Sequence, residues 1–304
     1  MKILRAIPTI AGVLACIAGL ATMAVAEPAI AAMTDSPSPA GAPPTAPAAA
    51  TATPGYADLV DLIEPAPLIL VVQIRKMEQL EPERAKDVRQ GWARIYVEAR
   101  SLAALRGTIP AGKDAGSETL AYLADVPLDD RGKLVNLAKR SMILAARPVP
   151  GQAEMVQLVA PDAQLPWDSA LEARVRAVLA ALQAPDAPAP VTGVREAIHV
   201  PGALIGEGET QIFLTTADGS PAAISVVQQP GKPPTWSASF SEVVDASGQP
   251  PAHDTLAWYR LARSLPADLP AGSNVSATPA DQAQAVADYR LVLAGLGPCG
   301  RTRS

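Results

Sequence analysis

The two histidines of this 304-residue chain, His199 and His253, are the first candidates for acid–base chemistry. Asp254 directly follows His253, and a histidine paired with a carboxylate is an arrangement that general-base catalysis uses. The sequence lacks a matching nucleophile motif, since it contains neither a Gly-X-Ser-X-Gly elbow nor a reactive-cysteine pattern. We therefore interpret Asp254 as the cap of a following helix, and we predict no catalytic residues.

Metal binding has one candidate cluster, in which acidic residues lie close to a histidine in the sequence. Its members are Glu196, His199, Glu207 and Glu209. Imidazole and carboxylate groups are common ligands of divalent metals, but no HExxH motif, paired-cysteine motif or Asp-rich calcium loop is present. We interpret the cluster as a solvated acidic turn beside a hydrogen-bonded histidine, and we predict neither a metal nor a cofactor.

The aromatic residues and cysteines offer weaker candidates. Four tryptophans could stack on sugars or peptides, but only 4% of the residues are aromatic, so we expect them in the core and at its corners. They are Trp92, Trp167, Trp236 and Trp258. Removal of a leader containing Cys16 would leave Cys299 alone, which excludes an intramolecular disulfide and leaves pairing between chains open.

The N-terminus resembles a secretory leader. Lys2 and Arg5 precede an apolar run over residues 6–25, and Ala24-Val25-Ala26 supplies small residues for cleavage before Glu27. We predict a signal peptide over 1–26, followed by a disordered Ala- and Pro-rich tether over 27–55, and hence a periplasmic or secreted protein. An uncleaved anchor and a lipoprotein modified at Cys16 are the alternatives, and membrane contact is expected only in those two cases.

Residues 56–182 are expected to form the first folded block. Short β-rich runs over 68–75, 92–100, 119–124, 142–146 and 155–159 predict five strands of a small antiparallel β-barrel. A helix should follow to residue 182, begin with a capping box of Ser169 and Glu172, and dock on the barrel. Three prolines mark 183–190 as a linker and a domain boundary.

The residues at the ends of these strands and in the turns between them support a resemblance to a known kind of barrel. A strand ends in Leu105-Arg106-Gly107, another opens after Lys139-Arg140, and a Pro-Gly turn stands at 150–151. This order resembles the OB-like barrels of secreted bacterial proteins that are related in shape to metalloprotease-inhibitor and netrin-like modules. The N-terminal cysteine and the disulfides of the inhibitors are missing, so inhibition by metal chelation is not implied. The whole chain resembles uncharacterised exported proteins of high-GC α-proteobacteria, which implies a location and no activity.

Residues 191–296 are expected to form a smaller α+β unit, followed by a tail over 297–304. Strands are predicted over 210–216, 222–228 and 235–244, and helices over 254–265 and 279–296. Thr278 should cap the last helix with Pro279 at its first position. One face of that helix is predicted to be apolar, with the residues Ala283, Val286, Tyr289, Leu293 and Leu296.

The composition and charge of the chain exclude one class of function and favour others. A formal charge of −5 and a pI near 5.2 argue against nucleic-acid binding. The sequence favours an exported, non-enzymatic binding or accessory protein whose partner is an unknown envelope protein or glycan. A periplasmic hydrolase using His253 or an acidic pair is the alternative, and a structural or assembly role is a third class.

Overall fold

A computed structural model describes residues 53–109, 118–241 and 248–302. The predicted signal peptide, Cys16 and nearly all of the predicted tether lie outside these residues. Within the described part of the chain, no helix is long and apolar enough to cross a membrane. The elements of the first part are α1 (Tyr56–Ile63), β1 (Leu68–Gln79), η1 (Pro82–Arg84), β2 (Trp92–Arg106), β3 (Thr119–Pro127), β4 (Ser141–Val149), β5 (Gln152–Leu158), β6 (Gln164–Pro166) and α2 (Ser169–Gln183). They are followed by β7 (Val191–Pro201), β8 (Gly208–Thr216), β9 (Ala223–Gln228), β10 (Thr235–Ser239), α3 (Leu256–Ser264) and α4 (Pro279–Leu296).

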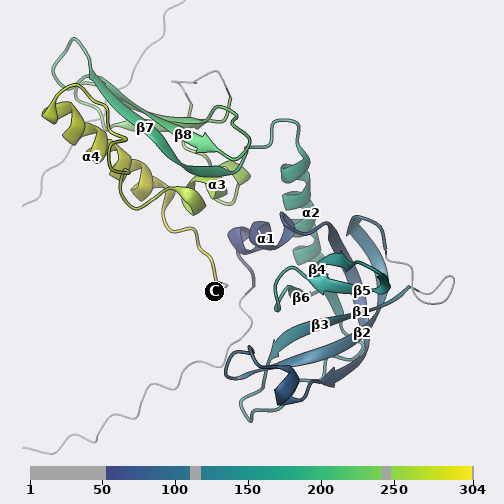
Figure 1. The fold of residues 1–304 in the computed structure, drawn as a ribbon. Helices are drawn as coiled ribbons and strands as arrows, with labels where there is room; N and C mark the ends of the chain where they lie inside the picture. Colours follow the sequence, from purple (N-terminus) through teal and green to yellow (C-terminus); the bar gives the residue numbers. More distant parts are fainter. Residues whose placement is uncertain (1–52, 110–117, 242–247, 303–304) are drawn as a thin grey trace, which may run out of the picture. The chain divides into compact units, whose positions relative to one another are not determined.

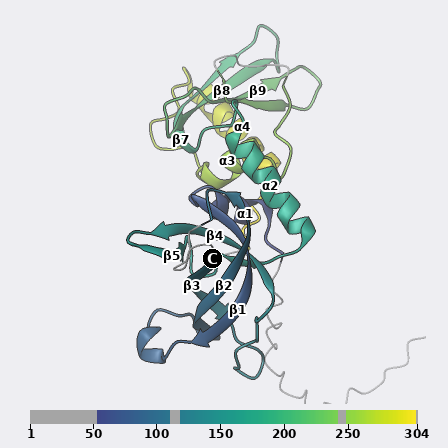
Figure 2. The ribbon, with the colours of Figure 1, turned by 90° about the vertical axis from the view of Figure 1, so that its right-hand side faces the viewer.

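The first five strands close into a barrel, as predicted. Neighbours follow the order β1, β2, β3, β5 and β4, and β4 pairs again with β1 (Figures 1 and 2). The barrel is mixed and not antiparallel throughout, because a ring of five strands cannot alternate direction at every junction. The parallel junction joins β3 to β5 through the pair Ala121 and Met155. Alternating side chains of β2, such as Ile95, Val97 and Ala99, fill the interior.

The second sheet is an antiparallel meander in the order β10, β9, β8 and β7, which confirms the α+β class. Helix α4 packs against β7 and β8, and α3 packs against β7 (Figure 1). The sequence pattern indicated three strands here, and β7 is the fourth. Its alternation is interrupted by two register shifts, one between Val191 and Gly193 and one between Val194 and Glu196.

Two of the predicted helix caps are wrong by one residue. Asp168, not Ser169, caps α2 by accepting a hydrogen bond from the backbone N–H of Leu171. Thr255, not Asp254, caps α3. In both places two capping-type residues stand side by side, so local composition does not distinguish them.

Helix α2 packs on α1 and α3.

Two carboxylates, Asp58 in α1 and Glu64 at its C-cap, bind residues that follow much later in the chain. The carboxylate of Asp58, which is fully buried, accepts a hydrogen bond from the backbone N–H of Thr302 at 3.1 Å. Glu64 accepts two hydrogen bonds from the guanidinium of Arg260, at 2.7 and 2.5 Å, and the same guanidinium donates to the carbonyl of Pro188 at 3.1 Å. The division into units at 183–190 stays a prediction.

Candidate ligand-binding site

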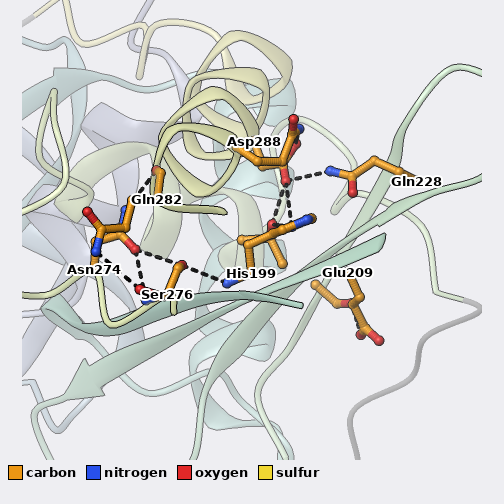
Figure 3. Close-up of polar contacts among 10 residues, drawn as sticks. His199, Glu209, Gln228, Asn274, Ser276, Gln282 and Asp288 are labelled. Atoms are coloured by element: carbon orange, nitrogen blue, oxygen red, sulfur yellow. Dashed lines mark hydrogen bonds and ion pairs between the residues drawn. The ribbon is translucent and has the colours of Figure 1, made fainter. Parts of the chain in front are cut away.

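A buried polar network lies between α4 and the second sheet. His199 of β7 and Asp288 of α4, both labelled in Figure 3, form its centre together with Thr210 of β8. The His199 Nδ1 atom lies 2.8 Å from the Thr210 hydroxyl oxygen, which lies 2.5 Å from Asp288 Oδ2. The three residues are 7%, 0% and 2% exposed, so their polar groups depend on one another for hydrogen bonds.

Asp288 reaches the network because α4 buries a different face from the predicted one. The apolar residues that bury this face are Ala285, Tyr289, Val292 and Leu296, of which only the tyrosine and the last leucine were predicted. Asp288 lies on the same face, one residue before Tyr289. The prediction of the buried face is wrong because that face carries an aspartate, so in the sequence it looks less apolar than its neighbour.

The Asp288 carboxylate is compensated by three donors. Besides the hydroxyl of Thr210, the side-chain amide of Gln228 donates to Oδ2 at 2.5 Å, and that of Gln284 donates to Oδ1 at 3.0 Å. A buried charge is costly unless hydrogen bonds replace its hydration. The residues that supply them come from β8, β9 and α4, so the carboxylate joins both layers of this unit.

The hydrogen bonds also determine which ring nitrogen of His199 carries the proton. The hydroxyl of Thr210 has one hydrogen, which it donates to Asp288, so its oxygen is left to accept from His199. In the neutral ring Nδ1 is therefore the donor and Nε2 has the free lone pair. Among the described residues, no side chain or backbone group forms a hydrogen bond with Nε2.

Gly208 makes room for the ring. A Cβ at this position would lie 2.7 Å from His199 Cε1, 3.0 Å from Nε2 and 2.8 Å from the side-chain oxygen of Gln228. Any larger residue would push the imidazole or the amide out of place. This glycine therefore serves close packing beside the histidine.

A second set of hydrogen bonds fixes the backbone of His199. Its N–H donates to the hydroxyl of Ser276 at 2.9 Å, and that hydroxyl donates to the side-chain oxygen of Asn274 at 2.8 Å. The Asn274 amide donates to the carbonyl of Gln282 in α4 at 2.9 Å (Figure 3). The loop before α4 therefore holds β7 and the helix in register.

A pocket of about 280 Å³ adjoins the network. Its lining consists of His199, Gly206, Glu207, Gln228, Ala280, Asp281 and Gln284. One oxygen of Glu207 accepts from the backbone N–H of Leu204 at 3.2 Å, and one oxygen of Asp281 accepts from Thr278 in the capping box of α4. The pocket therefore combines the edge of an ordered network with two carboxylates that are only partly engaged.

The four residues considered as a candidate metal cluster do not assemble around His199. Glu209 lies on the other face of the sheet, where it accepts a hydrogen bond from the Ser225 hydroxyl at 2.8 Å (Figure 3). Only Glu207 joins the histidine in the pocket lining. In the described ranges, no group of three histidine, cysteine or acidic side chains could hold a metal ion.

His253 lies outside this network. Its ring is exposed and tilted against that of Trp258, with centroids 5.1 Å apart. No ion pair joins it to a carboxylate in the part of the chain that the structure describes. Asp254, which follows it in the sequence, is also exposed and has a positive φ of 59°.

The barrel has a larger and more apolar pocket of about 500 Å³ along the junction of β3 and β5. Leu123, Met155 and Val159 contribute to its lining, together with an ion pair in which Arg94 donates to both oxygens of Asp125 at 2.7 and 2.9 Å. The opening exists because β3 and β5 share a single residue pair. It offers an apolar surface, but no titratable network comparable to that at His199.

The other candidates from the sequence are the four tryptophans and Cys299, and none of them belongs to the network around His199. Trp236 and Trp258 are buried, Trp92 lies 4.2 Å below the guanidinium of Arg89, and Trp167 is 41% exposed. Cys299 is partly buried, and burial is the main cause that raises the pKa of its thiol. A thiol with a raised pKa is a poor nucleophile at neutral pH.

Comparison with known proteins adds no family: no protein-family model matches the sequence, and no curated protein matches it. The site therefore rests on its own geometry. Sequence reasoning found His199 and Glu207 but missed Thr210, Gln228 and Asp288. The available signal was the alternation of β8, which places Thr210 on the same face as the apolar Ile212.

Proposed function

We propose that this protein is a non-catalytic binding protein of the cell envelope that holds a small polar ligand in the pocket beside His199. The observation that carries the proposal is the fixed orientation of the imidazole, whose Nδ1 atom is bound through Thr210 to Asp288. A pre-organised polar group at the wall of a small pocket lowers the ordering cost of binding. None of the lining residues is a serine, threonine, cysteine or lysine.

The envelope location is supported by the leader-like N-terminus. We expect the protein recovered from the envelope fraction to begin at Glu27, because the small residues before it match a signal-peptidase site. N-terminal sequencing tests this expectation. An intact Met1, or a lipid on Cys16, would place the protein at a membrane instead.

Two histidines in the chain allow a direct test of the pocket. In protein labelled at histidine, the His199 ring resonances should shift when a bound ligand occupies the pocket, while those of the exposed His253 serve as an internal control. We would screen small ammonium compounds, polyols and carboxylates by this measurement. A screen in which every class shifts both histidines equally, or neither, would refute the proposed binding site.

A hydrolase is the second candidate. The hydrogen-bonded chain from Asp288 through Thr210 to His199 favours His199 as its base, in place of His253, which the sequence offered as the alternative. This chain places a carboxylate behind the donor nitrogen and leaves Nε2 as a base that could activate water. The test is turnover of any ligand found in the screen. Turnover that is abolished in His199→Gln, while that variant still folds and binds, would replace the binding proposal with catalysis.

A further inference from the structure

The two glutamines of the pocket have their orientations fixed by Asp288. Each side-chain amide donates its N–H to the carboxylate, Gln228 at 2.5 Å and Gln284 at 3.0 Å. An ionised carboxylate only accepts hydrogen bonds, so the nitrogen of each amide must face it. The oxygen of each amide is then directed away from Asp288, and both residues line the pocket.

The other polar side chains of the lining are also acceptors. In the neutral form of the His199 imidazole the free lone pair lies at Nε2, since Nδ1 donates to Thr210. Glu207 and Asp281 each have a carboxylate with one oxygen engaged by the chain. All five polar side chains that line the pocket therefore offer acceptor atoms, and none of the lining residues is a lysine or arginine.

The pocket is also negatively charged, as a site made of hydrogen-bond acceptors for a cation should be. Glu207, Asp281 and the nearby Asp288 are acidic, and the N-terminus of α4 opposes them with the partial positive charge of a helix dipole. That dipole corresponds to about half a unit charge, and the capping carboxylate of Asp281 lies directly against it. The net electrostatic potential in the pocket is therefore negative.

We propose that this pocket binds an organic ammonium group, which supplies three N–H donors and one positive charge. This inference rests on the proposed binding function and names its ligand class. The loop that carries Glu207 also holds Leu204 and Ile205, which are 64% and 101% exposed. Such apolar side chains suit a ligand whose ammonium group is attached to a short hydrocarbon chain.

The test uses three probes with the same four-carbon chain: n-butylammonium, 1-butanol and butyrate. Each is titrated into the full-length mature protein while the His199 and His253 ring resonances are recorded. We expect saturable shifts at His199 with n-butylammonium only. Glu207→Gln should weaken this binding about tenfold, the effect of removing one charge a few ångströms from the ligand in largely aqueous surroundings, since Glu207 is exposed.

Glu209→Gln is the matched control. It removes the same charge two residues away, on the opposite face of the sheet, and should leave the affinity for n-butylammonium unchanged. An equal loss in both variants would mean that general charge, and not the pocket, attracts the cation. That result would overturn the inference.

The failures of the two proposals are distinguishable. If 1-butanol or butyrate saturates the His199 shifts and n-butylammonium does not, the pocket binds ligands but the ammonium class is wrong. If none of the three probes, nor the wider set of polyols, amines and carboxylates, shifts His199, the binding function itself fails together with this inference.

Discussion

Replacing Thr210 by valine tests the network that defines the site. The two side chains have nearly the same shape, so the change removes a hydroxyl without opening a cavity. In the native protein that hydroxyl accepts from His199 Nδ1 at 2.8 Å and donates to Asp288 Oδ2 at 2.5 Å. Thr210 is fully buried, so water cannot restore either hydrogen bond.

The cost follows from the groups left without partners. A lost hydrogen bond to a charged group and an orphaned buried N–H each cost about 1–3 kcal/mol. Asp288 keeps the two glutamine donors, and Nδ1 is 3.8 Å from Oδ2, close enough for a small movement to make a direct contact. We therefore expect a net destabilisation of about 2–3 kcal/mol, at the low end of the combined penalties. The melting temperature should fall by roughly 5–10 °C.

Thermal and urea unfolding, followed by circular dichroism, measure this change. Thr210→Ser is the control, because it keeps the hydroxyl and loses only a buried methyl group, at a cost of about 1 kcal/mol. The His199 resonances should also move in Thr210→Val and stay near their native positions in the serine variant. If valine is no more destabilising than serine, the bridging hydroxyl does not organise the site.

Three further changes test other parts of the structure. Gly208→Ala should displace the His199 ring and lower stability, whereas Gly193→Ala, where a Cβ would meet nothing within 4 Å, should be neutral or slightly stabilising in the same melts. Burial raises the pKa of Tyr289 to about 12, so the contribution of its neutral phenol to the free energy of unfolding is complete below about pH 10 and is lost as the pH rises toward 12. In urea unfolding, Tyr289→Phe should therefore lose less stability than the native protein as the pH rises through this range. Glu64→Gln leaves a nearly buried guanidinium without its charged partner, and should cost about 2–3 kcal/mol by urea unfolding, below the range for a fully buried pair because the glutamate is partly exposed; an unchanged midpoint would contradict this.

The barrel was the part most accessible to prediction. Each of its strands carries a local signal, an apolar run or a period of two, and the odd number of strands then requires one parallel junction. The position of that junction, at Ala121 and Met155, depends on how the chain returns through β4 and β5. It has no local signature in the sequence.

The candidate site was less accessible, because its partners are far apart in the chain. Thr210 and Asp288 are 78 residues apart, and each is an unremarkable polar residue in its own segment. The N-terminal cap of α4 was predicted from Thr278 and Pro279, since a cap is a local arrangement. The buried side of the same helix was not, because it includes the carboxylate of Asp288, which is tolerated there only with donors from β8 and β9 besides the one from α4 itself.

The contact between Asp58 and Thr302 has a consequence for the order of events during synthesis. Two of the donors to this buried carboxylate, the N–H and the hydroxyl of Thr302, belong to a residue 244 positions later in the chain. A ribosome that has made α1 must therefore add 244 more residues after Asp58 before that helix obtains these partners. Nascent chains of increasing length should accordingly leave α1 more open to proteases until Thr302 has emerged from the ribosome.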